Sequence, residues 1–304
     1  MKFRGPALGA LVLLAVPLLA SCARVGPHQV SGTGRLVVVA AENFWGSIAA
    51  QLGGERVTVT SIVTDPNADP HEHEASPADA RLLASANYVI VNGAGYDTWA
   101  DQLLAAQPES TRTVLTVATL LGRRSGDNPH FWYDPASVAR VVARITADYT
   151  ALNPDAAAYF NEQAVAFAQA LTPYHERLAN IRARFAGSPI AATESLFQYM
   201  ARYLGLDLIT PYAFMQAVAE GNDPPSPALV MFTQQIQKKA FVVLVFNSQT
   251  ITPLTTSLED QTAAAHLRTV AVTETLAPQT ATFQAWMDAE LDALSSALAA
   301  GRSA

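Results

Sequence analysis

Short hydrophobic runs alternate with amphipathic stretches along most of this chain. Four runs in the first half predict strands, and the first of them is a continuous β-branched run typical of a strand buried on both faces of a parallel sheet. They lie at residues 36–40, 56–63, 88–92 and 111–117. Helices are predicted between and after them, at residues 42–52, 77–85, 98–106 and 134–152. The clearest helix start is at Pro77, because Ser76 is a good N-cap and proline suits the first turn.

The second half of the chain shows the same alternation. Strands are predicted at residues 189–193, 207–210, 241–246 and 268–273. Helices are predicted at residues 195–203, 253–264 and 281–299, and a further helix begins at Ser226-Pro227. Strands that alternate with helices in this way form parallel sheets with helices on both faces. The predicted fold class is therefore α/β, with two doubly wound (β/α) lobes.

A long amphipathic stretch separates the two sets of strands. Residues 155–185 carry apolar side chains at near-helical spacing, which predicts a helix about 45 Å long. Pro173 lies inside this stretch, so a kink or two successive helices is the alternative. The expected domains are an N-terminal lobe at 35–153, a linking helix at 154–186 and a C-terminal lobe at 187–304.

The N-terminus has the pattern of a bacterial lipoprotein signal. Two basic residues, Lys2 and Arg4, precede a short hydrophobic run, and Cys22 follows the sequence Leu-Ala-Ser. The run is too short to span a membrane comfortably. We expect a cleaved signal peptide at residues 1–21, acylation of Cys22 and a flexible tether at residues 22–34. The expected location is therefore the extracytoplasmic face of the cell membrane, with the protein held there by lipid.

Composition limits the kinds of site and partner. Cys22 is the only cysteine, so the mature chain can form no internal disulfide and has no thiolate to offer a metal. Nitrogen and oxygen ligands must hold any metal that binds. The formal net charge of the full chain is −7, and loss of Lys2 and Arg4 with the signal lowers it by two, to about −9. Such an acidic protein is not expected to bind nucleic acid, and its charge favours cations.

Four side chains fall where open parallel sheets bind their ligands, beyond the carboxyl ends of the strands. His71, Glu194 and Glu274 each follow a predicted strand. His130 lies in a proline-containing loop just before a helix. If the lobes face one another, these side chains meet in the interlobe cleft, where two imidazoles and two carboxylates form a complete ligand set for a divalent first-row metal. His73 is an alternative ligand, and either glutamate could instead serve only as a helix-start carboxylate.

Three motifs add a resemblance to this interpretation. They are DPHxxExSP at residues 69–77, YVIVNG at residues 88–93 and NPHxWxDP at residues 128–135. With them, essentially the whole mature chain resembles the metal-binding lipoprotein family of solute-binding proteins that supply ABC importers of manganese, zinc or iron. The resemblance implies two lobes joined by a long helix, a metal site between the lobes, and a membrane permease as partner.

The resemblance also implies the ligands one by one. The first ligand of the family falls on His71 and the second on His130. The third, a histidine or a glutamate in the family, falls on Glu194. The fourth is usually an aspartate, and Glu274 takes its place here. Asn247 is a further departure, because the family often has an acidic residue at that position.

The ligand set bears on the choice of metal. Two histidines with two carboxylates favour harder ions such as manganese or ferrous iron, although zinc binds such sites tightly in vitro. The chain also lacks the histidine-rich acidic loop that many zinc-specific members of that family carry. We expect a divalent metal ion as the transported ligand, with manganese favoured and zinc or iron as alternatives. Because protons compete for the imidazoles, affinity should fall as the pH drops through the histidine range.

The sequence argues against two kinds of enzyme. A secreted metallohydrolase would need an open metal position and a nearby base, and the chain has no His-Glu-x-x-His helix. An esterase would need a Gly-x-Ser-x-Gly elbow, which is also missing from the sequence. A surface adhesin or structural lipoprotein with a vestigial site is the main alternative. We expect a monomeric binding protein that delivers its metal to an ABC permease, and not an enzyme.

Overall fold

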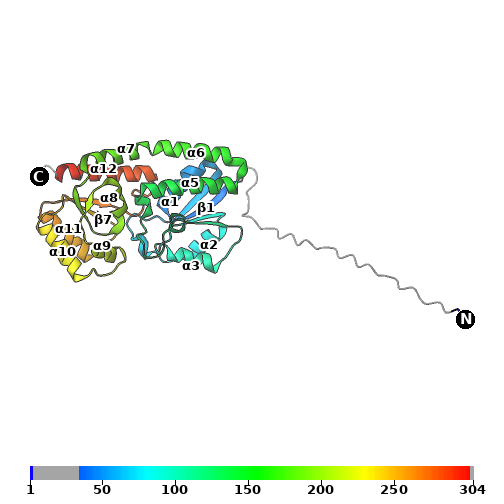
Figure 1. The fold of residues 1–304 in the computed structure, drawn as a ribbon, viewed down its shortest axis with the longest axis horizontal. Helices are drawn as coiled ribbons and strands as arrows, with labels where there is room; N and C mark the ends of the chain where they lie inside the picture. Colours follow the sequence, from blue (N-terminus) through cyan, green and yellow to red (C-terminus); the bar gives the residue numbers. More distant parts are fainter. Residues whose placement is uncertain (3–33, 302–304) are drawn as a thin grey trace.

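Two lobes lie side by side along a pair of long helices in this computed structural model (Figure 1). The structure describes residues 1–2 and 34–301. Cys22 and nearly all of the predicted signal (1–21) and tether (22–34) lie outside the described residues. Within the described part of the chain, no helix combines the length and the hydrophobicity needed to cross a bilayer.

The N-terminal lobe contains four strands, β1 (Leu36–Glu42), β2 (Val57–Val63), β3 (Tyr88–Val91) and β4 (Thr113–Thr116). Its helices are α1 (Asn43–Gly53), α2 (Pro77–Ser85), α3 (Thr98–Ala106), α4 (Val117–Leu121) and α5 (Pro135–Leu152). The strands form one parallel sheet in the order β2-β1-β3-β4. Every residue of β3 is buried, as expected for a strand covered by helices on both faces. α2 begins with the predicted cap, a capping box between Ser76 and Asp79.

The C-terminal lobe has the same design. Its strands are β5 (Pro189–Ala192), β6 (Asp207–Leu208), β7 (Val243–Asn247) and β8 (Arg268–Val272), and its helices are α8 (Gln198–Leu204), α9 (Tyr212–Ala219), α10 (Ser226–Gln237), α11 (Pro253–Ala264) and α12 (Phe283–Gly301). The parallel strand order β6-β5-β7-β8 matches that of the first sheet element for element. Two sheets of this kind confirm the predicted α/β class with two doubly wound lobes.

The linking stretch forms two helices instead of one. They are α6 (Ala157–Ala170) and α7 (Thr172–Phe185), which run one after the other along both lobes (Figure 1). Leu171 separates them, and Pro173 is the second residue of α7. Proline has no N–H to donate to the preceding turn and its ring crowds the carbonyl there, so the single helix expected at 154–186 is interrupted at this point.

Short elements account for most of the differences from the expected pattern. The structure adds α4 and α9, where the sequence suggested the end of a strand and a loop. α4 has only five residues and ends at Gly122 in the left-handed conformation, so it is too short to show a helical period. Single-turn 3-10 helices also precede or follow the longer elements: η1 (Gly54–Arg56), η2 (Pro70–Glu72), η3 (Phe131–Tyr133), η4 (Pro154–Ala156) and η5 (Ser195–Phe197).

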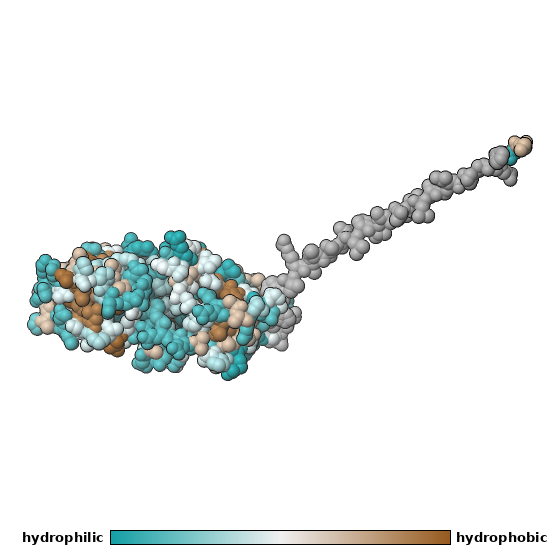
Figure 2. Space-filling view, turned by 90° about the horizontal axis from the view of Figure 1, so that it is seen from below, coloured by the Kyte–Doolittle hydropathy of each residue, from teal (hydrophilic) through white to brown (hydrophobic). Residues whose placement is uncertain are grey.

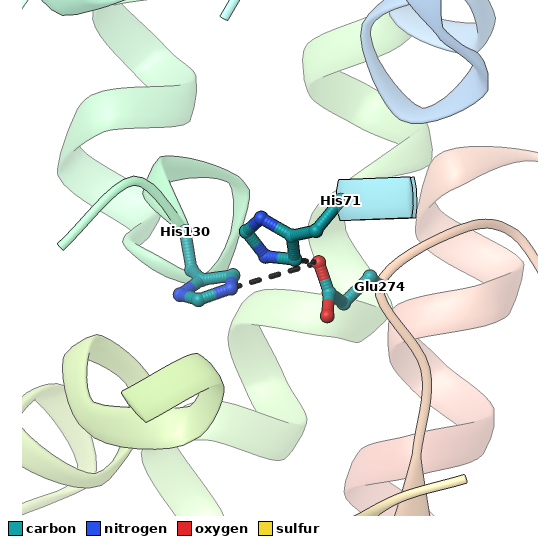
Figure 3. Close-up of side chains that lie close together, drawn as sticks. All are labelled: His71, His130 and Glu274. Atoms are coloured by element: carbon teal, nitrogen blue, oxygen red, sulfur yellow. Dashed lines mark ion pairs between the residues drawn. The ribbon is translucent and has the colours of Figure 1, made fainter. Parts of the chain in front are cut away.

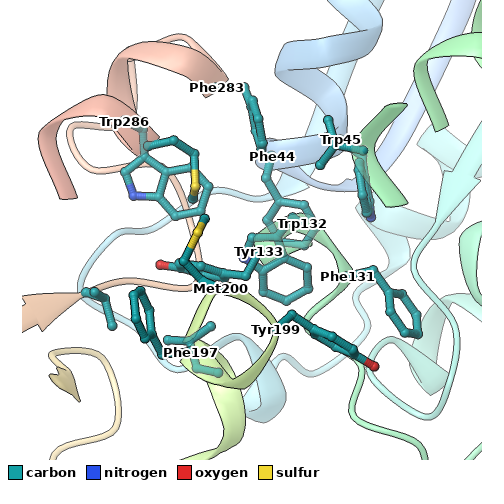
Figure 4. Packing of buried hydrophobic residues seen from close by; sticks show 14 of the residues in the cluster. Phe44, Trp45, Phe131, Trp132, Tyr133, Phe197, Tyr199, Met200, Phe283 and Trp286 are labelled. Carbon is teal, nitrogen blue, oxygen red and sulfur yellow. The ribbon is translucent and has the colours of Figure 1, made fainter. Parts of the chain in front are cut away.

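One hydrophobic core continues through both lobes (Figure 4). Phe44 of α1 stacks on Trp132 of η3 with ring centroids 3.9 Å apart. The adjacent Tyr133 meets Phe197 of the C-terminal lobe at 5.9 Å and Trp286 of α12 at 6.0 Å. Domains that share a large hydrophobic interface move little relative to each other. We therefore expect the cleft to keep a nearly constant width.

Candidate metal centre

His71 is held by the turn that follows β2. The side chain of Asp69 accepts a hydrogen bond from the backbone N–H of His71 at 2.9 Å and caps η2. Thr250 of the C-terminal lobe donates its hydroxyl to the same carboxylate at 3.3 Å. The imidazole meets the ring of Tyr96 edge to face, with centroids 4.6 Å apart. Contacts from both lobes thus aim His71 into the cleft.

His130 is fully buried, and Asn128 sets its orientation. The amide oxygen of Asn128 accepts hydrogen bonds from the backbone N–H of His130 at 3.1 Å and from its Nδ1 at 2.7 Å. The amide nitrogen of Asn128 donates to the carbonyl of Ser195 in the C-terminal lobe, so the oxygen must face His130. With the proton on Nδ1, the neutral ring presents the lone pair of Nε2, which is the form that binds a metal.

Glu274 closes the cluster from the C-terminal lobe (Figure 3). This carboxylate is fully buried, and its Oε2 lies 3.4 Å from Nε2 of His71 and 3.6 Å from Nε2 of His130. One ligand atom from each of these three residues falls within 4.8 Å of the others. Tyr96 donates its hydroxyl to Oε2 at 2.7 Å, and Asn247 donates its amide to Oε1 at 2.7 Å.

Glu194 lies beside this cluster and outside its tightest part. It follows β5 and is 2% exposed, and among the described residues neither of its oxygens has a hydrogen-bond partner. Nε2 of His71 and Nε2 of His130 also lack one. Buried polar groups are normally paired, and a buried carboxylate without a partner is costly. A cation between the two imidazoles and the two carboxylates would satisfy all of these groups at once.

The four groups shift one another's protonation. Burial opposes the charged imidazolium of His71, but the carboxylates of Glu274, Asp69 and Glu194, Glu274 above all, together outweigh burial and raise the pKa of His71 to about 9. Burial alone would raise the pKa of Glu274, and the two imidazoles instead hold it well below its usual range. Burial and the charge of Glu274 raise the pKa of Glu194 to about 8. Burial lowers the pKa of His130, which favours its neutral form.

His73, the alternative ligand, takes a different place. Its Nε2 lies 3.3 Å from a carboxylate oxygen of Asp79 at the start of α2, and its ring lies 4.6 Å from that of Trp99. It is not part of the grouping of His71, His130 and Glu274. The structure therefore leaves His73 out of the candidate metal centre.

A cavity of about 570 Å³ between the lobes leads to the two imidazoles. Its lining includes His71 and His130 together with the carboxylates of Glu72, Asp127 and Glu220. The surface between the lobes is mainly hydrophilic on the face seen from below (Figure 2). Acidic groups at an entrance raise the local concentration of cations and speed their capture.

Three residues whose side chains hydrogen-bond to Glu274 were not among the predicted ligands. Tyr96 and Asn247 bond to Glu274, and Gln249 accepts the backbone N–H of Glu274. Tyr96 follows β3 and Asn247 ends β7, at the same sheet edges as the ligands. This position along the sequence was the one feature that could have pointed to them. Their side chains are not charged, so a search for metal-binding residue types passes over them.

Residues 38–297 match the family model described as zinc-uptake complex component A, periplasmic. The manganese-binding lipoprotein MntA of Halalkalibacterium halodurans is 26% identical over 261 residues, which is 78% of this chain and 84% of that protein. The iron-binding protein YfeA of Yersinia pestis is 26% identical over 210 residues, or 66% of this chain and 67% of that protein. The periplasmic zinc-binding protein TroA of Treponema pallidum shares the fold with a TM-score of 0.73 and 16% identity, over 87% of this chain and 99% of that one.

Proposed function

This chain belongs to the zinc-uptake complex component A family, and from that premise we propose that it captures manganese in preference to zinc or iron and delivers it to an ABC permease. Its relatives are metal-binding lipoproteins and solute-binding proteins, so it is a periplasmic metal-binding protein of an ABC transporter and not an enzyme. The metallohydrolase considered from the sequence is thereby set aside. The proposal concerns which divalent metal the protein carries.

The observation that carries the proposal is a set of buried ligand atoms that form no hydrogen bond among the described residues. They are both carboxylate oxygens of Glu194, together with Nε2 of His71 and Nε2 of His130, which lie only at ion-pair distance from Oε2 of Glu274. A site used only for structure would be expected to hydrogen-bond such groups. We assign His71, His130, Glu194 and Glu274 as the ligands.

Ligand chemistry supports manganese as the preferred ion. Carboxylate oxygens suit harder ions, and imidazole nitrogens are borderline ligands that suit several first-row metals. A set of two imidazole nitrogens and two carboxylates therefore lies nearer to manganese or ferrous iron than a set of three histidines would. The relatives carry names with manganese, with iron and with zinc, so the preference for manganese rests on the ligand chemistry.

Capture and delivery would proceed without covalent chemistry. The ion enters through the acidic cavity, displaces protons from the ligands and is held between lobes that the shared aromatic core keeps close together. The permease then has to separate the ligands to release the ion.

We further propose lipid anchoring at Cys22, a monomeric state, and the lobe boundaries 35–153 and 187–304 around a linker at 154–186.

The test is the metal content of the soluble protein without its signal peptide, after equilibration with equal manganese, iron and zinc. We expect one equivalent of metal in the native protein and none in the double variant His71→Ala, His130→Ala. His175→Ala, an exposed histidine on α7, is the matched control and should keep its metal. Glu194→His should shift the bound metal toward zinc. If the native protein retains no metal, the adhesin or structural role replaces transport.

A further inference from the structure

Asn247 ends β7 with its side chain 3% exposed and in contact with the candidate metal centre. Its Nδ2 donates to Oε1 of Glu274 at 2.7 Å and to the hydroxyl of Thr250 at 3.0 Å. Its Oδ1 accepts the backbone N–H of Gln249 at 3.0 Å. If the amide were flipped, an oxygen would face the carboxylate and the N–H of Gln249 would lose its acceptor. The network therefore allows only the orientation in which Asn247 donates to Glu274.

The two oxygens of Glu274 face different partners. Oε1 accepts the bond from Asn247, whereas Oε2 accepts a bond from Tyr96 and also lies beside Nε2 of His71 and Nε2 of His130. An ion between the imidazoles reaches Oε2 directly. A carboxylate oxygen can accept a hydrogen bond and bind an ion at once, so the amide does not block Oε1 outright. Its bond instead fixes the rotation of the carboxylate, and turning both oxygens toward the ion would strain or break that bond and leave a costly unpaired buried donor. Glu274 is thus prepared to bind an ion through one oxygen.

Glu194 is in the opposite situation. Both of its oxygens are buried without a hydrogen-bond partner among the described residues, so either or both are available to an ion. The protein then offers Nε2 of His71, Nε2 of His130, Oε2 of Glu274 and the two oxygens of Glu194. That set suits four- or five-coordinate ions and leaves any sixth position to water.

We propose that Asn247 is a specificity-determining residue that limits Glu274 to one coordinating oxygen and so limits the number of ligands that the protein supplies. This inference rests on the proposed function, because it assumes that the site holds a divalent metal. Ions that require six to eight ligands, such as calcium, gain least from such a site. Removal of the amide would free Oε1 and favour ions of higher coordination number.

Cobalt(II) is the first probe, because its visible absorption is strong in four-coordinate sites, intermediate in five-coordinate sites and weak in six-coordinate sites. We expect the wild-type spectrum to be that of a four- or five-coordinate ion. Asn247→Ala should weaken the absorption and raise the ratio of manganese affinity to zinc affinity by roughly tenfold, the scale seen when a group that orients a metal ligand is removed. Ser248→Ala alters the next residue without touching a ligand, and it should change neither the cobalt absorption nor the ratio of manganese affinity to zinc affinity.

A crystal structure of the manganese-loaded wild-type protein decides the matter even if the variant fails to fold. Glu274 should coordinate through Oε2 alone, with Asn247 still bonded to Oε1. Coordination by both oxygens of Glu274, or a folded alanine variant with the wild-type spectrum and affinity ratio, would overturn the inference. A wild-type protein that binds neither cobalt nor manganese would instead overturn the proposed function itself.

Discussion

The side-chain amide of Gln249, in the C-terminal lobe, donates a hydrogen bond to the backbone carbonyl of Ala68, in the N-terminal lobe, at 2.8 Å. The oxygen of the same amide accepts the backbone N–H groups of Glu274 and Thr275. One buried side chain therefore connects the loop that leads to His71 with the loop that carries Glu274. The relative position of two proposed ligands from different lobes depends on it.

Replacement of this connection should loosen the metal centre. In Gln249→Ala, the N–H groups of Glu274 and Thr275 and the carbonyl of Ala68 lose their partner. We expect metal affinity to fall by about tenfold, mainly through faster release, because groups that orient metal ligands contribute on this scale. Stopped-flow exchange against a chelator measures the release rate. Gln234→Ala, on the exposed face of α10, is the control, and equal release rates in the two variants would contradict the prediction.

Loss of the Tyr96 hydroxyl should weaken binding without changing the stoichiometry. The phenol donates to Oε2 of Glu274 at 2.7 Å, and that oxygen is the one nearest both imidazoles. Tyr96→Phe keeps the ring and its contact with His71 but removes the orienting donor. We expect affinity to drop by about 10- to 100-fold with one ion still bound. Competition titration with a metal-binding dye measures both quantities, and an unchanged affinity would show that the donor is dispensable.

Metal affinity should rise steeply with pH up to about 9. In the metal-free protein the pKa of His71 is raised to about 9 and that of Glu194 to about 8, so both groups carry a proton at neutral pH. An ion must displace both protons. Affinity should therefore change about 100-fold per pH unit below pH 8, about tenfold between pH 8 and 9, and little above. His130, whose pKa is lowered, adds nothing to this dependence near neutral pH.

This window lies higher than the ordinary histidine range expected from the sequence, because Glu274 stabilises the proton on His71. Calorimetric titration in two buffers with different ionisation enthalpies counts the protons released, and about two are expected at pH 7. An affinity that stays constant between pH 6 and 8 would exclude proton displacement from these ligands.

Tyr133 should contribute to stability by joining the two lobes. Its hydroxyl donates to Oε2 of Glu290 on α12 at 2.6 Å and lies 2.8 Å from the carbonyl of Thr273. Tyr133→Phe leaves the carboxylate without this donor, at a cost of about 1–3 kcal/mol in the free energy of unfolding. Denaturant unfolding of the metal-free protein provides the measurement. Tyr159→Phe, whose hydroxyl accepts an exposed backbone N–H, should cost less than about 0.5 kcal/mol.

Several elements could be predicted from the sequence because local chemistry defines them. α2 begins where its cap and proline indicated, and α3 and α11 have the predicted bounds. The alternation of strands and helices was enough to predict the fold class, since few arrangements other than a parallel sheet covered by helices bury the hydrophobic faces of such elements. Elements without a local signal, such as the five-residue α4, were missed.

The candidate ligands could also be proposed from sequence, because side chains that follow parallel strands gather at one edge of the sheet. The distances between these ligands and the identity of their hydrogen-bond partners could not be predicted from the sequence. The bonds from Tyr96 to Glu274 and from Gln249 to Ala68 join residues separated by 178 and 181 positions. Such contacts depend on how one lobe sits against the other, which the shared aromatic core determines through packing of whole side chains. The sequence alone thus determined most of the elements and the residue types of the site, and the tertiary structure decided which of their atoms meet.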